Sequence, residues 1–236
     1  MTSLPITSPG SWVFSGDVPT VFVDHARHSV PLYDAGHDLV CDLSTCFLGG
    51  DGPHIGYELG SATGQLLHRL ATHGPANHAT HWIGVDREAA MVKAAREHCA
   101  GLDNVEVVEG DLTTIAYQHC DFVVAYLTMH FLPPGLRREV FRQICQALRP
   151  GGAFFMFDKV LAPGAQLEDL ITTLHYRFKR NAGLSPEEIL NKKESLLGVL
   201  QPVSTDDNVA LLKEAGFASY GTILKYLAFE GFIAIK

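Results

Sequence analysis

From residue 54 to residue 157 this chain alternates short apolar runs with segments of helical spacing. The apolar runs fall at residues 55–59, 81–85, 105–108, 122–126 and 153–157. Helical spacing falls between them, at residues 65–71, 87–99 and 136–148. Strands buried on both faces have continuous apolar runs, and connections that contain a helix join parallel strands. The pattern therefore predicts an α/β fold with a mostly parallel sheet.

Both ends of the chain have a different pattern. Helices are predicted at residues 18–30, with Asp17 as a candidate cap, and at residues 31–48, before the glycine-rich break at 49–53. After Asp158 we expect helices at 166–181, 186–197 and 209–215, then strands at 220–227 and 231–235. The 236 residues suit one domain, residues 1–236, with an N-terminal helical cap at 1–52 and a helical insert at 162–204 before the last two strands.

Composition excludes several classes of protein. The net charge is −8 and no Lys/Arg-rich run occurs, so we do not expect direct nucleic-acid binding. No apolar run reaches the roughly 20 residues that span a bilayer, and the N-terminus lacks a secretory pattern, so we expect a cytoplasmic protein without membrane contact. Five cysteines without a C-x-x-C pair, and histidines without a full ligand set, predict neither disulfides nor a metal site.

The strongest local motif is the stretch at residues 58–64, between a predicted strand and a predicted helix. Gly60 and Gly64 let the backbone turn tightly and lie close to a ligand. The spacing is neither G-x-G-x-x-G nor a P-loop. Glu58 suits a ligand with an ammonium group and no pyrophosphate. The alternative is a plain strand-to-helix turn with structural glycines.

Two carboxylates follow at the ends of the next two strands. Asp86 is placed to accept the ribose hydroxyls of an adenosine moiety, and it could equally cap the following helix. Asp111 is placed to accept from an adenine amino group, with Leu112 beside the ring; the alternative is a turn aspartate. Because the carboxyl ends of parallel strands meet at one edge of the sheet, the three motifs together predict a nucleoside site.

Taken together, these motifs resemble those of the class I S-adenosylmethionine (SAM)-dependent methyltransferases. The chain is also similar to the carboxy-S-adenosylmethionine synthase family at residues 12–14, 29–33, 58–64, 108–111 and 175–181, and around Glu188, Ile189 and Lys192. The resemblance covers residues 11–236. It implies a Rossmann-like SAM methyltransferase fold with seven strands, SAM or carboxy-SAM as cofactor, and a homodimer. That family makes carboxy-SAM from SAM and prephenate for wobble-uridine modification of tRNA.

The resemblance also implies site residues. It places the cofactor contacts at Tyr33, Gly60, Ser61, Ala62, Asp86, Arg87, Asp111 and Leu112. We also predict cofactor contacts from residue chemistry alone: the carboxylate of Glu58, the backbone of Gly64 and the aromatic ring of Tyr126.

Two positions depart from the family pattern. Tyr126 stands where the family has an asparagine, and Lys193 stands where it has the arginine that pairs with the carboxylate of carboxy-SAM. Lysine keeps the charge but lacks the two-pronged geometry of a guanidinium. We therefore expect a SAM-dependent methyltransferase acting on a small carboxylate-bearing molecule. Carboxy-SAM synthesis and non-catalytic SAM binding are the alternatives.

The remaining candidates concern chemistry and substrate. Tyr126 and His130 are candidate proton acceptors after the fourth strand, and packing is the alternative for each. A cationic patch for a carboxylate substrate is predicted from His175, Tyr176, Lys179, Arg180 and Lys193. Its alternative is a solvated basic face.

Overall fold

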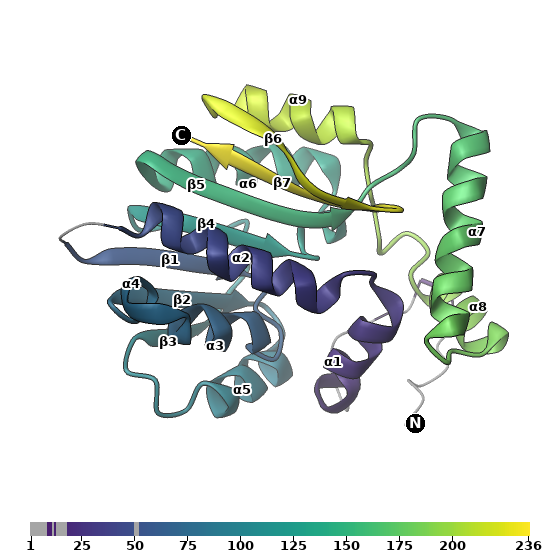
Figure 1. Cartoon of the computed structure of the whole chain (residues 1–236), viewed down its shortest axis with the longest axis horizontal. Coiled ribbons are helices and arrows are strands. Elements are labelled where there is room, and N and C mark those ends of the chain that lie inside the picture. Colours follow the sequence, from purple (N-terminus) through teal and green to yellow (C-terminus); the bar gives the residue numbers. More distant parts are fainter. Residues whose placement is uncertain (1–8, 11, 13–17, 50–51) are drawn as a thin grey trace.

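The computed structural model describes residues 9–10, 12, 18–49 and 52–236. In that part, seven strands form one sheet in the order β3-β2-β1-β4-β5-β7-β6 (Figure 1). The strands are β1 (His54–Leu59), β2 (Thr80–Asp86), β3 (Val105–Glu109), β4 (Cys120–Tyr126), β5 (Leu148–Lys159), β6 (Ser219–Tyr226) and β7 (Phe229–Ile235). Strands β1 to β5 are parallel, and β7 is antiparallel to β5 and β6. The predicted α/β fold with a mostly parallel, seven-stranded sheet is confirmed.

Helices flank this sheet and extend beyond one of its ends. They are α1 (Val18–Ser29), α2 (Tyr33–Phe47), α3 (Gln65–Thr72), α4 (Gly74–His78), α5 (Ala89–His98), α6 (Pro134–Ala147), α7 (Ala165–Asn181), α8 (Pro186–Ser195) and α9 (Thr205–Ala215), with a 3-10 turn, η1 (Met129–Phe131). Among the helices of the described ranges, none is long and apolar enough to cross a membrane. The candidate cap Asp17 lies outside the described residues, as do Gly50 and Asp51.

The core lies on both faces of the sheet. Every residue of β4 is buried, which explains its continuous apolar run. Phe122 and Val124 pack with the layer of α2, α3 and α5, whereas Val123 and Ala125 pack with α6 and α9. This alternation follows from the two-residue repeat of a strand, and it makes β4 the centre of the fold.

Two boundaries and one short helix are the main differences from the sequence prediction. Strand β5 begins at Leu148, inside the predicted helix, because Leu148 pairs with Cys120 and Arg149 donates to Asp121 at 2.6 Å. Helix α9 begins at Thr205, since Ser204 forms a capping box at its N-terminus. The short helix α4 was not predicted.

Helices α1, α7 and α8 stand beyond the carboxyl ends of the parallel strands (Figure 1). His175 of α7 donates from Nε2 to the backbone oxygen of Ser29 at 2.7 Å, which ties α7 to the end of α1. Helix α8 opens with the predicted capping box of Ser185 and Glu188. The edge where the nucleoside motifs end is therefore faced by the two helices of the predicted insert.

Candidate functional site

The glycine turn lies between the carboxyl ends of β1 and β2. The amides of Gly60 and Ser61 donate to the backbone oxygen of Val85 at 2.8 and 3.0 Å. Gly60 and Gly64 have φ of +74° and +77°, a region that favours glycine, and a Cβ at Gly60 would collide with the side chain of Thr128. The two glycines are thus required by the backbone, as the motif predicted.

Asp86, at the end of β2, holds this turn in place. Its Oδ2 accepts from the amide of Ala62 at 2.8 Å, and its Oδ1 accepts from the amide of Glu88 at 3.0 Å. Ala62 is itself in the left-handed region, with φ of +45°. Burial raises the pKa of Asp86, while the two amides lower it. Each carboxylate oxygen keeps a lone pair, so the side chain can still accept two ribose hydroxyls.

Glu58 is a buried carboxylate at the end of β1, with 4% of its surface exposed. Burial raises its pKa well above the usual value, and the charge of Asp86 adds to this effect. Its Oε2 has no hydrogen-bond partner within the described chain, and the same holds for the hydroxyl oxygens of Ser61 and Thr63. Buried polar atoms are normally paired, so these three indicate a ligand that is polar and partly cationic. An adenosyl sulfonium with an amino-acid group fits that requirement.

Asp111 follows β3 on the same edge. Its Oδ1 accepts from the amide and the hydroxyl of Thr113, at 2.8 and 2.7 Å, and these bonds lower its pKa. Leu112 packs against the core cluster beside it. The Arg87 side chain is largely exposed and lies near Glu88. Asp111 and Leu112 therefore lie together just after β3, and their contact with adenine stays a prediction, as does that of Arg87.

Tyr126 ends β4 inside an aromatic cluster with Tyr33, His37 and Phe157. Its ring stacks on Phe157 with centroids 4.8 Å apart, and its hydroxyl donates to the backbone oxygen of Tyr33 at 2.9 Å. Burial raises the pKa of both tyrosines. A buried phenol whose proton is already donated suits a wall better than a proton acceptor.

His130, in η1, is buried against the end of β5. Its Nδ1 accepts from the amide of Lys159 at 3.0 Å and lies 3.1 Å from Oδ1 of Asp158. Asp158 in turn accepts from the amide of Thr128 at 3.1 Å, and the Thr128 hydroxyl donates to the backbone oxygen of Leu59 at 2.9 Å. These bonds connect the glycine turn, through Thr128, to the last residues of β5.

A group of lysines gathers at the carboxyl end of β5, and we call Lys159, Lys179 and Lys192 the lysine cluster. They come from β5, α7 and α8. Burial and then the neighbouring ammonium groups lower the pKa of Lys179 to about 8 and that of Lys192 to about 6. Burial lowers the pKa of Lys159, the charge of Glu168 raises it, and the charge of the exposed Lys193 lowers it further. In the described ranges none of these four lysines forms a salt bridge. With a pKa of about 6, Lys192 is mostly neutral at pH 7, so the positive charge here comes mainly from the other three lysines.

Aromatic and imidazole groups border the lysine cluster. Lys192 lies over the ring of Trp12, which stacks near His25. Burial, followed by the charges of Lys192 and Lys179, lowers the pKa of His25 to about 3. Burial and Lys179 lower the pKa of His175 to about 4. Both histidines are therefore neutral at pH 7 beside the lysines.

The predicted substrate patch is brought together only in part. His175 and Lys179 lie in or beside the lysine cluster, and Lys193 is close enough to act on Lys159. Arg180 is exposed, and Tyr176 is half-buried without any link to the cluster. Lys159 and His25 were missed; the signal for Lys159 was its place just after a buried strand.

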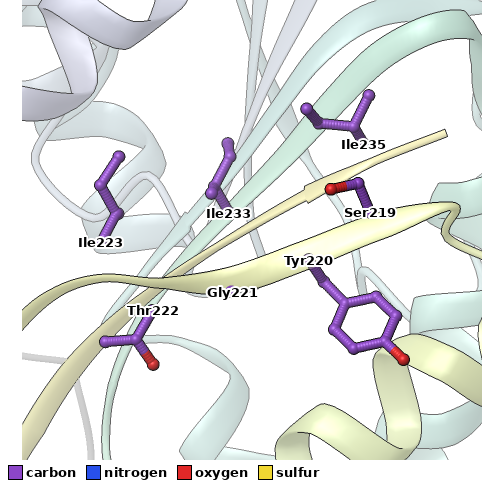
Figure 2. Close-up of a pocket in the computed structure, with 7 residues that line it drawn as sticks. All are labelled: Ser219, Tyr220, Gly221, Thr222, Ile223, Ile233 and Ile235. Carbon is purple, nitrogen blue, oxygen red and sulfur yellow. The ribbon is translucent and has the colours of Figure 1, made fainter.

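A separate groove lies at the far edge of the sheet, on β6 and β7 (Figure 2). It is lined by Ser219, Tyr220, Gly221, Thr222, Ile223, Ile233 and Ile235. None of these side chains is charged, and none belongs to the glycine turn. The groove therefore offers nothing that would hold an adenosyl cofactor. In the part of the chain with assigned positions, no group of three or more His, Cys, Asp or Glu could hold a metal ion.

Comparison with known proteins identifies related chains. A methyltransferase domain model matches residues 57–152. Carboxy-S-adenosyl-L-methionine synthase of Staphylococcus epidermidis is 29% identical over 97% of this chain and 99% of its own. That of Wolinella succinogenes is 31% identical over 94% of this chain and 92% of its own.

Solved structures show the same fold. A putative O-methyltransferase of Nostoc punctiforme matches with a TM-score of 0.63 and 16% identity, covering 92% of this chain and 60% of its own. Human N-acetylserotonin methyltransferase, solved with SAM, has the same TM-score and identity, and the match covers 99% of this chain. This chain spans 60% of the length of each of them.

The fold and the site define a SAM-dependent transferase with the class I methyltransferase fold, and SAM is its cofactor. Within that class, the near full-length similarity is decisive. The chain belongs to the carboxy-S-adenosyl-L-methionine synthase family.

Proposed function

We propose that this protein makes carboxy-SAM from SAM and a carboxylate donor of the prephenate type. The observation that carries the proposal is the lysine cluster at the carboxyl end of β5. Prephenate has two carboxylates and carboxy-SAM has one more than SAM, so both reactant and product need several cations. Lys159 and Lys179, with Lys193 near them, supply cations next to the site predicted for the cofactor, and Lys192 would become a further cation when a bound carboxylate favours its protonated form.

The position of the cluster relative to the glycine turn supports the same reaction. Thr128 touches both sides, because its hydroxyl bonds to Leu59 and its amide bonds to Asp158. Lys159 follows Asp158 directly. Lys159 ends β5, whereas Asp111 follows β3 on the other side of β4. A carboxylate held by Lys159 would therefore lie near the predicted sulfonium and away from the predicted adenine site.

The residues have distinct tasks in this proposal. Asp86 and Asp111 would orient the adenosine, and Glu58 would balance the positive charge of the cofactor. The lysines would hold the carboxylates and Tyr126 would close the pocket against water. Lys193 would keep the charge of the family arginine. One ammonium cannot form the two-pronged contact of a guanidinium, so the other three lysines would provide the additional hydrogen bonds to the carboxylates.

Methyl transfer to a small carboxylate-bearing molecule is the second candidate. Tyr126 and Lys193 favour it, because each replaces a family residue of different shape. The same lysine cluster would then bind the carboxylate of the methyl acceptor. The two candidates differ in the product and not in the cofactor.

The first test is to purify the protein without added ligand, denature it, and identify the released nucleoside by mass spectrometry. Carboxy-SAM in the extract supports the synthase proposal. SAM or S-adenosylhomocysteine alone favours methyl transfer. Lys159→Met should release less carboxy-SAM than the wild type, and Lys213→Met on the exposed face of α9 serves as the matched control.

We also propose that the protein forms a homodimer in the cytoplasm. Leu167, Leu170 and Leu174 recur along α7 and are 48%, 54% and 45% exposed. A stripe of this kind on one helix fits a second helix of the same sequence. Light scattering of the wild type should give twice the chain mass, and Leu170→Lys should lower it to one.

A further inference from the structure

We infer that His130 is a positioning residue that sets the place of Lys159 in the lysine cluster, and is not a proton acceptor in the reaction. This inference rests on the proposed function, because it concerns the binding of the carboxylate. It goes further by assigning the control of that binding to a residue that does not belong to the cluster.

The end of β4 explains why a side chain is needed there. The amide of Leu127 still donates to the backbone oxygen of Phe157 at 2.7 Å, but Leu127 has φ of +58° and turns the chain away. In a continued parallel ladder the next amide, that of Lys159, would donate to a carbonyl of β4. With the strand ended, Nδ1 of His130 accepts this bond at 3.0 Å. The imidazole thus replaces the missing backbone partner.

This bond fixes the direction in which Lys159 leaves the sheet. On its other side, β5 pairs with β7 through Lys159 and Phe229, and the amide of Val160 donates to Ala228 at 2.7 Å. The backbone at Lys159 is therefore held from both sides. Its side chain is directed to the cluster, where its charge acts on Lys179.

The same bond also bears on the tautomer. While Nδ1 accepts from the Lys159 N–H, it carries the lone pair and Nε2 carries the ring proton; a proton on Nδ1, facing Oδ1 of Asp158 at 3.1 Å, would break the bond to Lys159. In this form Nε2 donates and does not accept. A general base at His130 would have to give up the bond to Lys159.

Substituting asparagine for His130 distinguishes a positioning role from a proton-accepting role. The Asn Oδ1 lies at the position of Nδ1 and can accept from the Lys159 amide, but it cannot take up a proton at neutral pH. His130→Asn should therefore keep prephenate affinity and turnover close to the wild type. His130→Ala leaves the amide without a partner, and it should raise the KM for prephenate about tenfold, the loss typical of one buried hydrogen bond, with a much smaller change in kcat.

The experiment combines turnover, calorimetric binding of prephenate to the protein loaded with S-adenosylhomocysteine, and hydrogen exchange of the Lys159 amide. The expected result is a fast-exchanging amide and weak prephenate binding in His130→Ala, with both restored in His130→Asn and SAM affinity unchanged in each. A loss of kcat in His130→Asn equal to that in His130→Ala would overturn the inference. So would an amide that stays protected in His130→Ala. If the wild type itself binds no prephenate, the proposed function fails, while the exchange data still decide the role of His130.

Discussion

The two sides of the site differ in the sign of their charged side chains. On the side of β1, β2 and β3, the buried Glu58 and the half-buried Asp86 lie at a tight backbone turn, and both have raised pKa values. On the side of β5, α7 and α8, half-buried lysines lie together, and their pKa values are lowered. On each side, burial and neighbouring groups of like charge disfavour the ionised side chains, and a ligand of the opposite charge would offset this cost. This difference in charge supports the proposal of two separate sites, one for the cationic cofactor and one for an anionic substrate.

The largest expected effect comes from breaking the acidic side. Asp86→Ala removes the acceptor for the Ala62 and Glu88 amides and for the ribose, and it should weaken SAM binding by about 100-fold, since bonds to a charged group contribute about 1.5–3 kcal/mol each. Titration calorimetry with SAM measures this. The exposed Asp103→Ala is the control, and wild-type affinity in Asp86→Ala would disprove the ribose role.

Removing one lysine from the cationic side should weaken the binding of prephenate. Lys159→Met keeps most of the unbranched side chain but removes one cation. Prephenate binding to the protein loaded with S-adenosylhomocysteine should weaken about tenfold, with SAM affinity unchanged. The same variant should unfold at a higher temperature, because removing the Lys159 charge relieves its repulsion with Lys179. Lys213→Met should change neither quantity. Weaker SAM binding in Lys159→Met would mean that the two sides are not separate.

The pH dependence sharpens the comparison. Lys192 has a folded-state pKa of about 6, below the usual value of 10.5, so the unfolded chain binds more protons between these values. Its contribution to stability therefore rises with pH from about 6 upward. A bound carboxylate favours the protonated lysine, so prephenate binding at pH 7 should take up protons. Calorimetry in buffers of different ionisation enthalpy measures this uptake, and no uptake would contradict the lowered pKa.

The smallest effect is expected at the boundary between the two sides. Tyr126→Phe removes one hydrogen bond to Tyr33 and should cost about 1 kcal/mol of unfolding free energy. Turnover should fall by less than about threefold, as for a wall residue that keeps its ring. Thermal denaturation and initial rates give both values. A loss of all turnover would instead assign the phenol a direct role in the reaction.

The acidic side could be predicted from sequence because its parts are local. Glu58, Asp86 and Asp111 each end a recognisable strand, and parallel strands bring such ends together by topology alone. The predicted sheet and its strand types follow from the same periodicity. The start of β5 could not be predicted, since it depends on the contact between Arg149 and Asp121, which are 28 residues apart.

The cationic side was predicted only in part because it depends on tertiary structure. Lys179 was named from helical spacing within the insert and Lys193 from the resemblance to the family, whereas Lys159 and His25 come from β5 and α1, far along the chain. No local pattern states that β5, α1, α7 and α8 converge. The role of His130 was equally hidden, because it depends on a left-handed turn at Leu127 that leaves one amide without a strand partner.

The most direct test of the account is a reaction of the purified protein with SAM and prephenate that is isotopically labelled in its ring carboxylate. The adenosyl product is then identified by mass spectrometry. The account predicts carboxy-SAM that carries the label, formed by the wild type and by Lys213→Met and strongly reduced in Lys159→Met. Recovery of unlabelled SAM with intact prephenate, from a protein that binds SAM, would contradict it.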